Sequence, residues 1–371
     1  VLEGWKYKIA IPAPALFGQF NNLDDIDIVL TGLKQMGFDD VYEVSRGAEL
    51  VSDATRKLMA DGRLPKPVIS SACPAVVRLI RVRFPDLCDH VLNLNAPMEV
   101  SAMMAKRAAS ERTGIPVEEI GAFFITPCPA KVTDIKMPIG TEGSWCDGAI
   151  AISEVFPLLS HRMDKLETVE PIGQSGLIGV SWAGSGGESA ALLNEKYLAA
   201  DGIENVIRVL EELEDERIRE LDFVELNACS GGCVGGVLCV ENGYVAKARL
   251  QRLRKYLPVS QNHLDGGVPR DMEWTEPLEF APVLKLSQNL EEAMQMMEEI
   301  DVICEGLPGL DCGSCGAPSC RALAEDVVKG VARTSDCVFV MREQVKNVAD
   351  TLSSIGGYVP SYLDSKEKQG N

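Results

Sequence analysis

The residues of this chain whose types and spacing could do chemistry are its cysteines. The 371 residues include 12 cysteines but only 3 histidines, and no histidine lies within a cysteine cluster. A chain of this length without a secretory signal is not expected to depend on a disulfide framework. Zinc sites often recruit histidine, so thiolates without imidazole favour iron–sulfur clusters.

Three strand-like runs lead directly into cysteines. The runs and the cysteines that follow them are 67–71 with Cys73, 122–126 with Cys128, and 222–226 with Cys229 and Cys233. Sites in open α/β sheets form outside the carboxyl ends of strands, because the loops there converge. We therefore expect these four thiols to build one metal site. The alternative is that these are structural cysteines buried in the core. Three strand ends of the same kind favour the metal site over this alternative.

A second cysteine cluster lies near the C-terminal end of the sequence. Cys312, Cys315 and Cys320 follow the pattern C-x2-C-x4-C, and Cys337 comes seventeen positions later. Three ligands in a tight loop with a fourth returned by a helix fit a 4Fe–4S cluster. Zinc is the alternative, disfavoured because paired CxxC motifs are missing, and a redox CxxC lacks its βαβ context.

Four cysteines belong to neither cluster. Cys88 and Cys239 have apolar neighbours in the sequence and are expected in the core, while Cys304 neighbours the second cluster. Cys146 is a candidate proton carrier, although a passive role is favoured.

Composition excludes several classes of protein. The formal net charge of −19, from 36 basic and 55 acidic residues, repels nucleic acid and anionic membranes. No apolar run reaches the roughly 18 residues of a membrane span. The chain begins without a methionine or a signal sequence, so we expect it to be a piece of a longer protein. We expect that protein to be cytoplasmic. The acidic surface serves solubility, with steering of a basic redox partner as the alternative.

Short β-rich runs alternate with helical patterns over the first two-thirds of the sequence. The expected strands are 7–11, 40–44, 67–71, 122–126, 177–182 and 222–226. The expected helices are 24–36, 48–60, 98–113, 147–159, 188–198 and 204–219. Such alternation predicts an α/β fold of mostly parallel sheets flanked by helices.

A change in the sequence pattern, from alternating strands and helices to helices alone, predicts a second, small and mainly helical domain. The stretch 257–282 is interrupted by Pro and Gly, and helices are expected beyond it at 288–300, 321–331 and 339–352. The predicted domains are residues 1–284 and residues 285–371, and the polar tail 365–371 is expected to fray.

The cysteine motifs resemble those of a known family. Ser71-Ala-Cys73-Pro74, Thr126-Pro-Cys128-Pro-Ala-Lys131 and Glu225-Leu-Asn-Ala-Cys229-Ser-Gly-Gly-Cys233 are similar, in order, to the three signatures of iron–iron (FeFe) hydrogenases. Ile11-Pro-Ala-Pro14-Ala15 and Gly47-Ala-Glu-Leu50 also resemble that family, over roughly residues 7–250. The segment 307–320 is similar to 4Fe–4S domains of Rnf-type subunits and of sensory FeFe-hydrogenase-like proteins.

The resemblance implies an H-cluster lying between two lobes of the large domain. Its 4Fe–4S cubane would be held by Cys73, Cys128, Cys229 and Cys233. Cys233 would also bridge to a di-iron subsite that carries CO and cyanide, and Lys131 would contact a cyanide. The same pocket would be lined by Ala13, Pro14, Met98 and Asn227.

The chain also departs from the family pattern. Ala72 stands where the family usually has a cysteine that passes protons, and Asn227 stands where it has a methionine. Met98 replaces a glutamine, Asp134 replaces a glutamate, and the usual acidic relay residues do not align around 52–55. Alanine cannot carry a proton, so slow turnover and membership of a sensory branch are implied.

The resulting hypothesis is a protein that binds hydrogen and converts it slowly and reversibly to protons and electrons, as a hydrogen sensor. Electrons would pass through the cubane toward the second cluster, with a redox or signalling protein as partner and maturation proteins installing the di-iron site. The alternative is a non-catalytic iron–sulfur protein resembling cytosolic cluster-assembly factors. A pure electron-transfer subunit explains the small domain alone.

Overall fold

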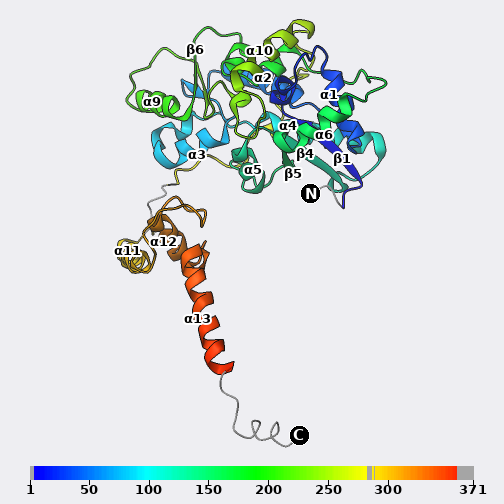
Figure 1. Ribbon diagram of the computed structural model, residues 1–371. Coiled ribbons are helices and arrows are strands. Elements are labelled where there is room, and N and C mark those ends of the chain that lie inside the picture. Colours follow the sequence, from blue (N-terminus) through cyan, green and yellow to red (C-terminus); the bar gives the residue numbers. More distant parts are fainter. Residues whose placement is uncertain (1–3, 282–285, 288, 357–371) are drawn as a thin grey trace, which may run out of the picture. The chain divides into compact units, whose positions relative to one another are not determined.

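The computed structural model describes residues 4–281, 286–287 and 289–356. The chain forms two compact units, Val1–Ala281 and Pro282–Asn371 (Figure 1). The domain boundary predicted between residues 284 and 285 falls in a segment outside the described residues. No helix of the described residues is long and apolar enough to cross a membrane.

The first parallel sheet of the larger unit has the strand order β2-β1-β4-β5. Its strands are β1 (Tyr7–Pro12), β2 (Asp40–Val41), β4 (Ile120–Thr126) and β5 (Gly148–Ala151). Every residue of β4 is buried, as expected for a parallel strand covered on both faces. Alternate residues of β4 supply two different cores, with Phe123 and Ile125 on one face and Ala122 and Phe124 on the other.

The second sheet is also parallel and has the order β3-β7-β6. Its strands are β3 (Val68–Ile69), β6 (Tyr197–Asp201) and β7 (Phe223–Asn227). Val68 and Phe223 share a core with residues of α2 (Val44–Ala60) and α4 (Pro97–Thr113). The next residues along both strands, Ile69 and Val224, pack against α3 (Pro74–Arg83) and α9 (Ile203–Glu214).

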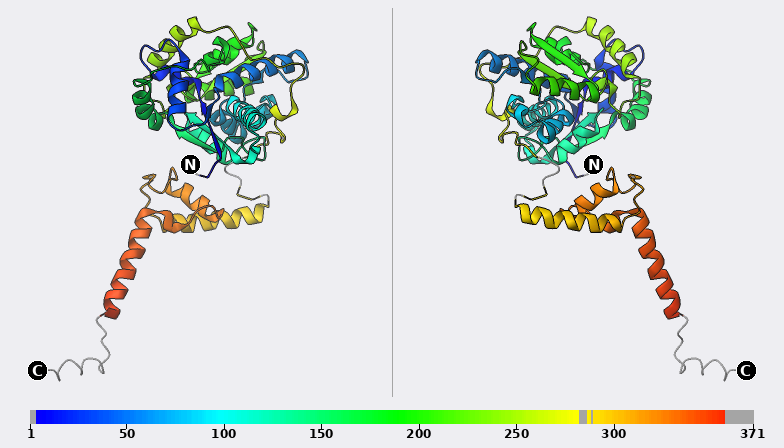
Figure 2. Two further views of the ribbon diagram at one scale, coloured as in Figure 1. Left: turned by 90° about the vertical axis from the view of Figure 1, so that its right-hand side faces the viewer. Right: turned by 90° about the vertical axis from the view of Figure 1, so that its left-hand side faces the viewer.

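Helices therefore cover both faces of both sheets (Figure 2). The outer face of the first sheet is covered by α1 (Ile26–Gln35), α6 (Ile152–Met163) and α10 (Gly243–Leu253). Helix α4 contributes to the inner cores of both sheets, because Ala102 packs on the first and Met103 on the second. The predicted α/β class with two parallel sheets is confirmed.

Three sequence-based assignments were wrong. The segment 177–182, predicted as a strand, forms the short helix α7 (Leu177–Ser181). A buried apolar run this short has no period that separates strand from helix. The predicted helix 147–159 contains strand β5 before α6, since Gly148–Ala151 pairs with β4. The predicted helix 188–198 is split into α8 (Gly187–Ala191) and β6, whose register is set by β7.

The smaller unit is helical in the part that the structure describes. Its helices are α11 (Leu290–Glu305), α12 (Cys320–Val328) and α13 (Val338–Gly356). Ile300, Leu323 and Cys337 lie in its small core. The first residue of the predicted helix 288–300 and the predicted frayed tail lie outside the described residues.

Candidate metal centre

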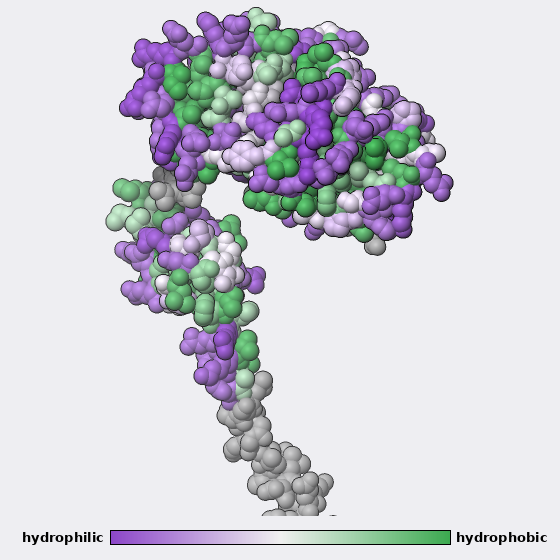
Figure 3. Space-filling model, turned by 45° about the horizontal axis from the view of Figure 1, so that its top comes forward, coloured by the Kyte–Doolittle hydropathy of each residue, from purple (hydrophilic) through white to green (hydrophobic). Residues whose placement is uncertain are grey.

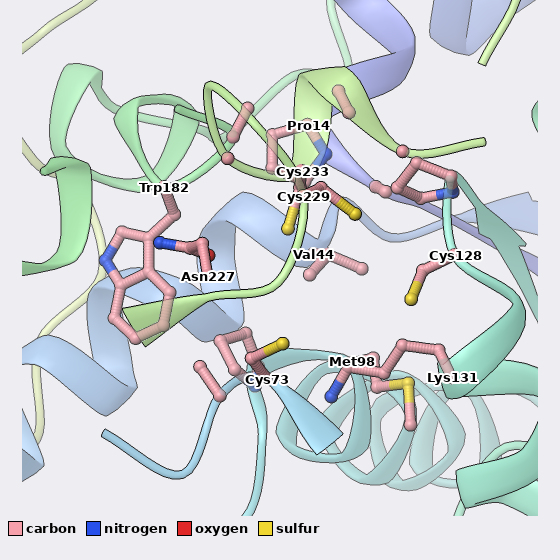
Figure 4. Close-up of a pocket in the computed structure, with 18 of the residues that line it drawn as sticks. Pro14, Val44, Cys73, Met98, Cys128, Lys131, Trp182, Asn227, Cys229 and Cys233 are labelled. Atoms are coloured by element: carbon pink, nitrogen blue, oxygen red, sulfur yellow. The ribbon is translucent and has the colours of Figure 1, made fainter. Parts of the chain in front are cut away.

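One cavity of about 100 Å³ in the larger unit collects the cysteines of all three motifs (Figure 4). Cys73 follows β3, Cys128 follows β4, and both Cys229 and Cys233 follow β7. The carboxyl ends of strands from both sheets therefore meet at this cavity. The other residues proposed from the sequence also line it, namely Ala13, Pro14, Ala72, Met98, Lys131 and Asn227.

Proline and glycine shape the backbone around the thiols. Cys73 and Cys128 are the N-cap residues of α3 and α5 (Pro129–Lys136), and each is followed by the proline that begins its helix. Gly232 has φ +92°, and a side chain there would collide with the backbone of Gly184 and Ser185. The loop that carries Cys229 and Cys233 can therefore pack against a neighbouring loop only with glycine at this position.

The thiols share an environment that disfavours several negative charges at once. All twelve cysteines are free of disulfides. Burial, together with the nearby Cys128 and Cys73, raises the pKa of Cys229 to about 11. Desolvation inside the cavity and the same two neighbours also raise the pKa of the Cys233 thiol. A positively charged metal cluster would reverse this penalty, because bound cations stabilise coordinating thiolates.

Lys131 presents an unsatisfied cation to the same cavity. Its side chain is 13% exposed, and the nearest carboxylate oxygen, Oδ2 of Asp134, is 3.8 Å from Nζ. Nζ is buried and has no hydrogen-bond partner. A buried ammonium without a hydrogen-bond partner is costly, so this donor favours an anionic acceptor inside the cavity.

Two buried carboxyl groups, which the sequence reasoning missed as site residues, also line the cavity. Ser70 donates a 2.7 Å hydrogen bond to Glu188. Glu225 accepts hydrogen bonds from the backbone of Gly186 and Ser189 and from the side chain of Asn227, at 2.8–2.9 Å. Burial raises the pKa of both glutamates, and Glu225 raises that of Glu188 further. A charged residue between the apolar Val224 and Leu226 of a predicted strand was the available signal for Glu225.

The remaining wall of the cavity is largely apolar. Val44, Met98 and Trp182 contribute to it, and Trp182 is oriented by a 3.0 Å hydrogen bond from Nε1 to Oγ of Ser52. Thr55 donates a 2.8 Å hydrogen bond to the backbone oxygen of Val51 within α2. No carboxylate of the segment 52–55 lines the cavity, because Asp53 pairs with neighbouring basic residues of α2.

Cys146 lies behind the cavity wall. It is buried, does not line the cavity, and its thiol donates a 3.8 Å hydrogen bond to the backbone oxygen of Met98. Burial raises its thiol pKa well above the usual value. These features give no support to the proton-carrier role considered from the sequence.

The second cysteine cluster lines a small cavity of its own in the smaller unit. The cysteines that line it are Cys312, Cys315, Cys320 and Cys337. Ser319 caps α12 with a 3.1 Å bond to the backbone of Ala322, which fixes the position where Cys320 begins the helix. Cys304 packs nearby but does not line this cavity.

Neither cluster has the geometry of a site for one ion. In the described ranges, no three His, Cys, Asp or Glu side chains come together to hold a single metal ion. A 4Fe–4S cluster attaches each cysteine to a different iron, so its ligands stand farther apart than those of a zinc ion. The four thiols that line each cavity are a donor set that suits an iron–sulfur cluster.

The chain belongs to the family described as iron only hydrogenase large subunit, C-terminal domain, whose sequence model matches residues 6–197 and 188–237. A second family, described as "Putative Fe-S cluster", matches residues 307–339, which contain the second cysteine cluster.

Two hydrogenases are among the curated relatives. Iron hydrogenase 1 of Clostridium pasteurianum is 20% identical over 284 residues, covering 62% of this chain and 50% of the relative. NADP-reducing hydrogenase subunit HndD of Solidesulfovibrio fructosivorans is 22% identical over 260 residues, covering 55% and 44%. The chain thus spans about half the length of these relatives.

A protein named for a different role is also similar over a shorter stretch. The cytosolic Fe-S cluster assembly factor nar1 of Aspergillus terreus is 30% identical over 99 residues, which is 26% of this chain and 16% of that protein.

Solved structures show the same fold. A variant of FeFe-hydrogenase HydA1 from Chlamydomonas reinhardtii superposes with a TM-score of 0.59 at 18% identity, covering 75% of this chain and 95% of that one. The structure of HydA(deltaEFG) gives a TM-score of 0.51 at 19% identity, covering 68% and 83%.

Proposed function

We propose that this protein is a hydrogenase-like iron–sulfur protein that binds hydrogen and slowly interconverts it with protons and electrons. The observation that carries the proposal is the buried Nζ of Lys131, which has no hydrogen-bond partner, in a cavity lined by four thiols. A plain 4Fe–4S protein needs the thiols, but it has no use for a buried cation aimed at an additional anionic group.

The residues of the cavity fit an H-cluster. Cys73, Cys128, Cys229 and Cys233 would hold its cubane, with Cys233 also bridging to the di-iron subsite. Lys131 would donate a charge-assisted hydrogen bond to a cyanide ligand. Ala13, Pro14, Met98 and Asn227 would line the di-iron side. When bound, this group supplies the reversible splitting of hydrogen and takes up the electrons.

The chain's own residues exclude water and hold protons. Val44, Met98 and Trp182 give the cavity an apolar wall, which strengthens the electrostatic effect of Lys131. Ala72 cannot carry a proton. Its backbone N–H donates to Oγ of Ser70 at 3.1 Å, and Ser70 in turn donates to Glu188. We infer that the buried Glu188, whose pKa is raised by burial and by Glu225, partly replaces the missing thiol as proton donor.

A sensory role is the finer part of the proposal. Loss of the usual proton carrier at Ala72 predicts slow turnover, which suits a protein that reports hydrogen rather than consuming it. The second 4Fe–4S cluster, held by the cysteines of the smaller unit, would exchange electrons with a redox or signalling partner. We place the protein in the cytoplasm, where maturation proteins would install the di-iron site.

Infrared spectroscopy on protein matured with a di-iron precursor tests the proposal directly. We expect bands of bound CO and cyanide that shift when hydrogen is supplied. Protein that holds both 4Fe–4S clusters yet never shows these bands would instead support a role like that of the assembly factor, to which the short similarity to nar1 points.

A further inference from the structure

A second cavity, of about 210 Å³, opens beside the loop formed by residues 184–187. Val180 of α7 and Leu250 of α10 supply apolar walls, while Lys247 and Arg254 bring two cationic side chains. Both basic residues come from the same face of α10 and its C-cap, because seven residues make about two helical turns. This cavity contains none of the cysteines.

The two cations lack acidic partners. Within the described part of the chain, neither Lys247 nor Arg254 forms an ion pair, and no carboxylate lines the cavity. Nζ of Lys247 reaches only the backbone oxygen of Ser185, at 3.4 Å, and Nε of Arg254 is buried without a hydrogen-bond partner. In a chain with 55 acidic and 36 basic residues, two adjacent unpaired cations in a hollow indicate an anion that binds from outside.

We propose that this cavity binds a small phosphate-bearing molecule. The planar fork of an arginine and the point charge of a lysine together match phosphate oxygens, as in many phosphate sites. The cavity is larger than a bare phosphate, and Val180 and Leu250 can cover an attached apolar or ring group. Hydrophilic and apolar residues are interspersed over the visible surface of the larger unit (Figure 3).

Backbone hydrogen bonds connect the wall of this cavity to the candidate metal centre, so a bound ligand can influence that centre. The backbone N–H of Ser185 donates to Gly231 at 3.0 Å, and that of Val234 donates to Ala183 at 2.9 Å. These bonds join the wall of the second cavity to the loop that carries Cys229 and Cys233. The N–H of Gly186, in the same wall, binds Glu225. Binding itself does not depend on the hydrogenase proposal, since it needs no iron.

Isothermal titration calorimetry of the purified full chain with pyrophosphate and with inorganic phosphate, at constant ionic strength, tests this site. We expect pyrophosphate to bind more tightly than phosphate, and Arg254→Gln or Lys247→Gln to weaken pyrophosphate binding at least tenfold. Arg252→Gln is the matched control, because Arg252 is exposed on the same helix and does not line the cavity.

Gln251 lines the cavity and is exposed, so substitutions at this position should not affect folding. They provide a second pair of variants. Gln251→Lys should tighten pyrophosphate binding several-fold, and Gln251→Glu should weaken it by a similar factor. The proposal is overturned if millimolar pyrophosphate does not bind, or if binding is the same in the Arg254, Lys247 and Arg252 variants.

Discussion

The hydroxyl of Ser70 donates a 2.7 Å hydrogen bond to the carboxyl group of Glu188. Ser70 directly follows β3, the strand that leads to Cys73, whereas Glu188 lies on α8. The contact therefore joins one of the cysteine-bearing strand ends to a buried carboxyl pair. Through Ser70, the titratable Glu188 is linked to the backbone of Ala72, whose own side chain is a methyl group that cannot titrate.

Replacing Glu188 with glutamine tests its role as proton donor. Glutamine keeps the size and can accept the hydrogen bond of Ser70, but it does not titrate. Hydrogen evolution by the matured protein should fall by about 10²–10⁴, the usual contribution of general acid–base catalysis, with unchanged CO and cyanide bands. Glu43→Gln is the control, because Glu43 is equally buried but lies outside the cavity. Equal loss in both variants would contradict the assignment.

The same glutamate predicts a pH dependence of stability. Burial and Glu225 raise the pKa of Glu188 in the folded protein, so the folded state binds its proton more tightly than the unfolded state. This contribution is complete below the unfolded pKa of about 4.3 and is lost as the pH rises through the folded pKa. Urea unfolding from pH 5 to 8 should show a falling free energy of unfolding, and Glu188→Gln should flatten that fall. An unchanged slope in the variant would rule this out.

Sequence reasoning anticipated the parts of the site that are marked by local patterns. Cys73 and Cys128 stand out because each follows a strand and precedes a helix-starting proline. Glu188 carries no such local pattern, since its hydrogen-bond partner Ser70 lies 118 positions earlier in the chain. Strand β5 was missed for the same kind of reason, because Gly148–Ala151 has weak β propensity and is a strand through its pairing with β4.

Lys131→Ala should impair the di-iron site without affecting the cubane. The substitution removes the only charge-assisted donor that we assign to a cyanide ligand, while the four thiols stay in place. Infrared bands of CO and cyanide should weaken or shift after maturation, and iron content before maturation should be unchanged. Lys136→Ala, at an exposed position of the same helix, should behave as the wild type. Normal bands in Lys131→Ala would remove the argument that rests on its ammonium group, which has no hydrogen-bond partner.

Cys315→Ser should separate the two metal centres. Eight ligand cysteines predict two 4Fe–4S clusters, or about eight irons per chain before the di-iron site is added. The variant should lose about half of this iron and keep the infrared signature of the larger unit, as measured by iron analysis and spectroscopy on the same sample. Cys304→Ser should keep all of it, because Cys304 does not line the cluster cavity. Loss of all iron in Cys315→Ser would show that the two sites are not independent.

Ala72→Cys should make the protein a faster catalyst. Ala72 lines the cavity, and its backbone already contacts Ser70, which contacts Glu188. A thiol at this position adds a group that can donate and accept a proton inside the cavity that the two carboxyl groups also line, and proton transfer requires steps of roughly 3 Å. Hydrogen evolution should rise several-fold at unchanged iron content.

Two further variants show whether that increase comes from proton transfer. Ala72→Val adds bulk but no titratable group, so its rate should not rise above that of the wild type. The double variant Ala72→Cys with Glu188→Gln should lose most of the gain, because the new thiol would receive its proton through Ser70 and Glu188. A gain that survives in the double variant would mean that protons reach residue 72 by another route. A wild-type rate equal to that of a fast hydrogenase would contradict the sensory role itself.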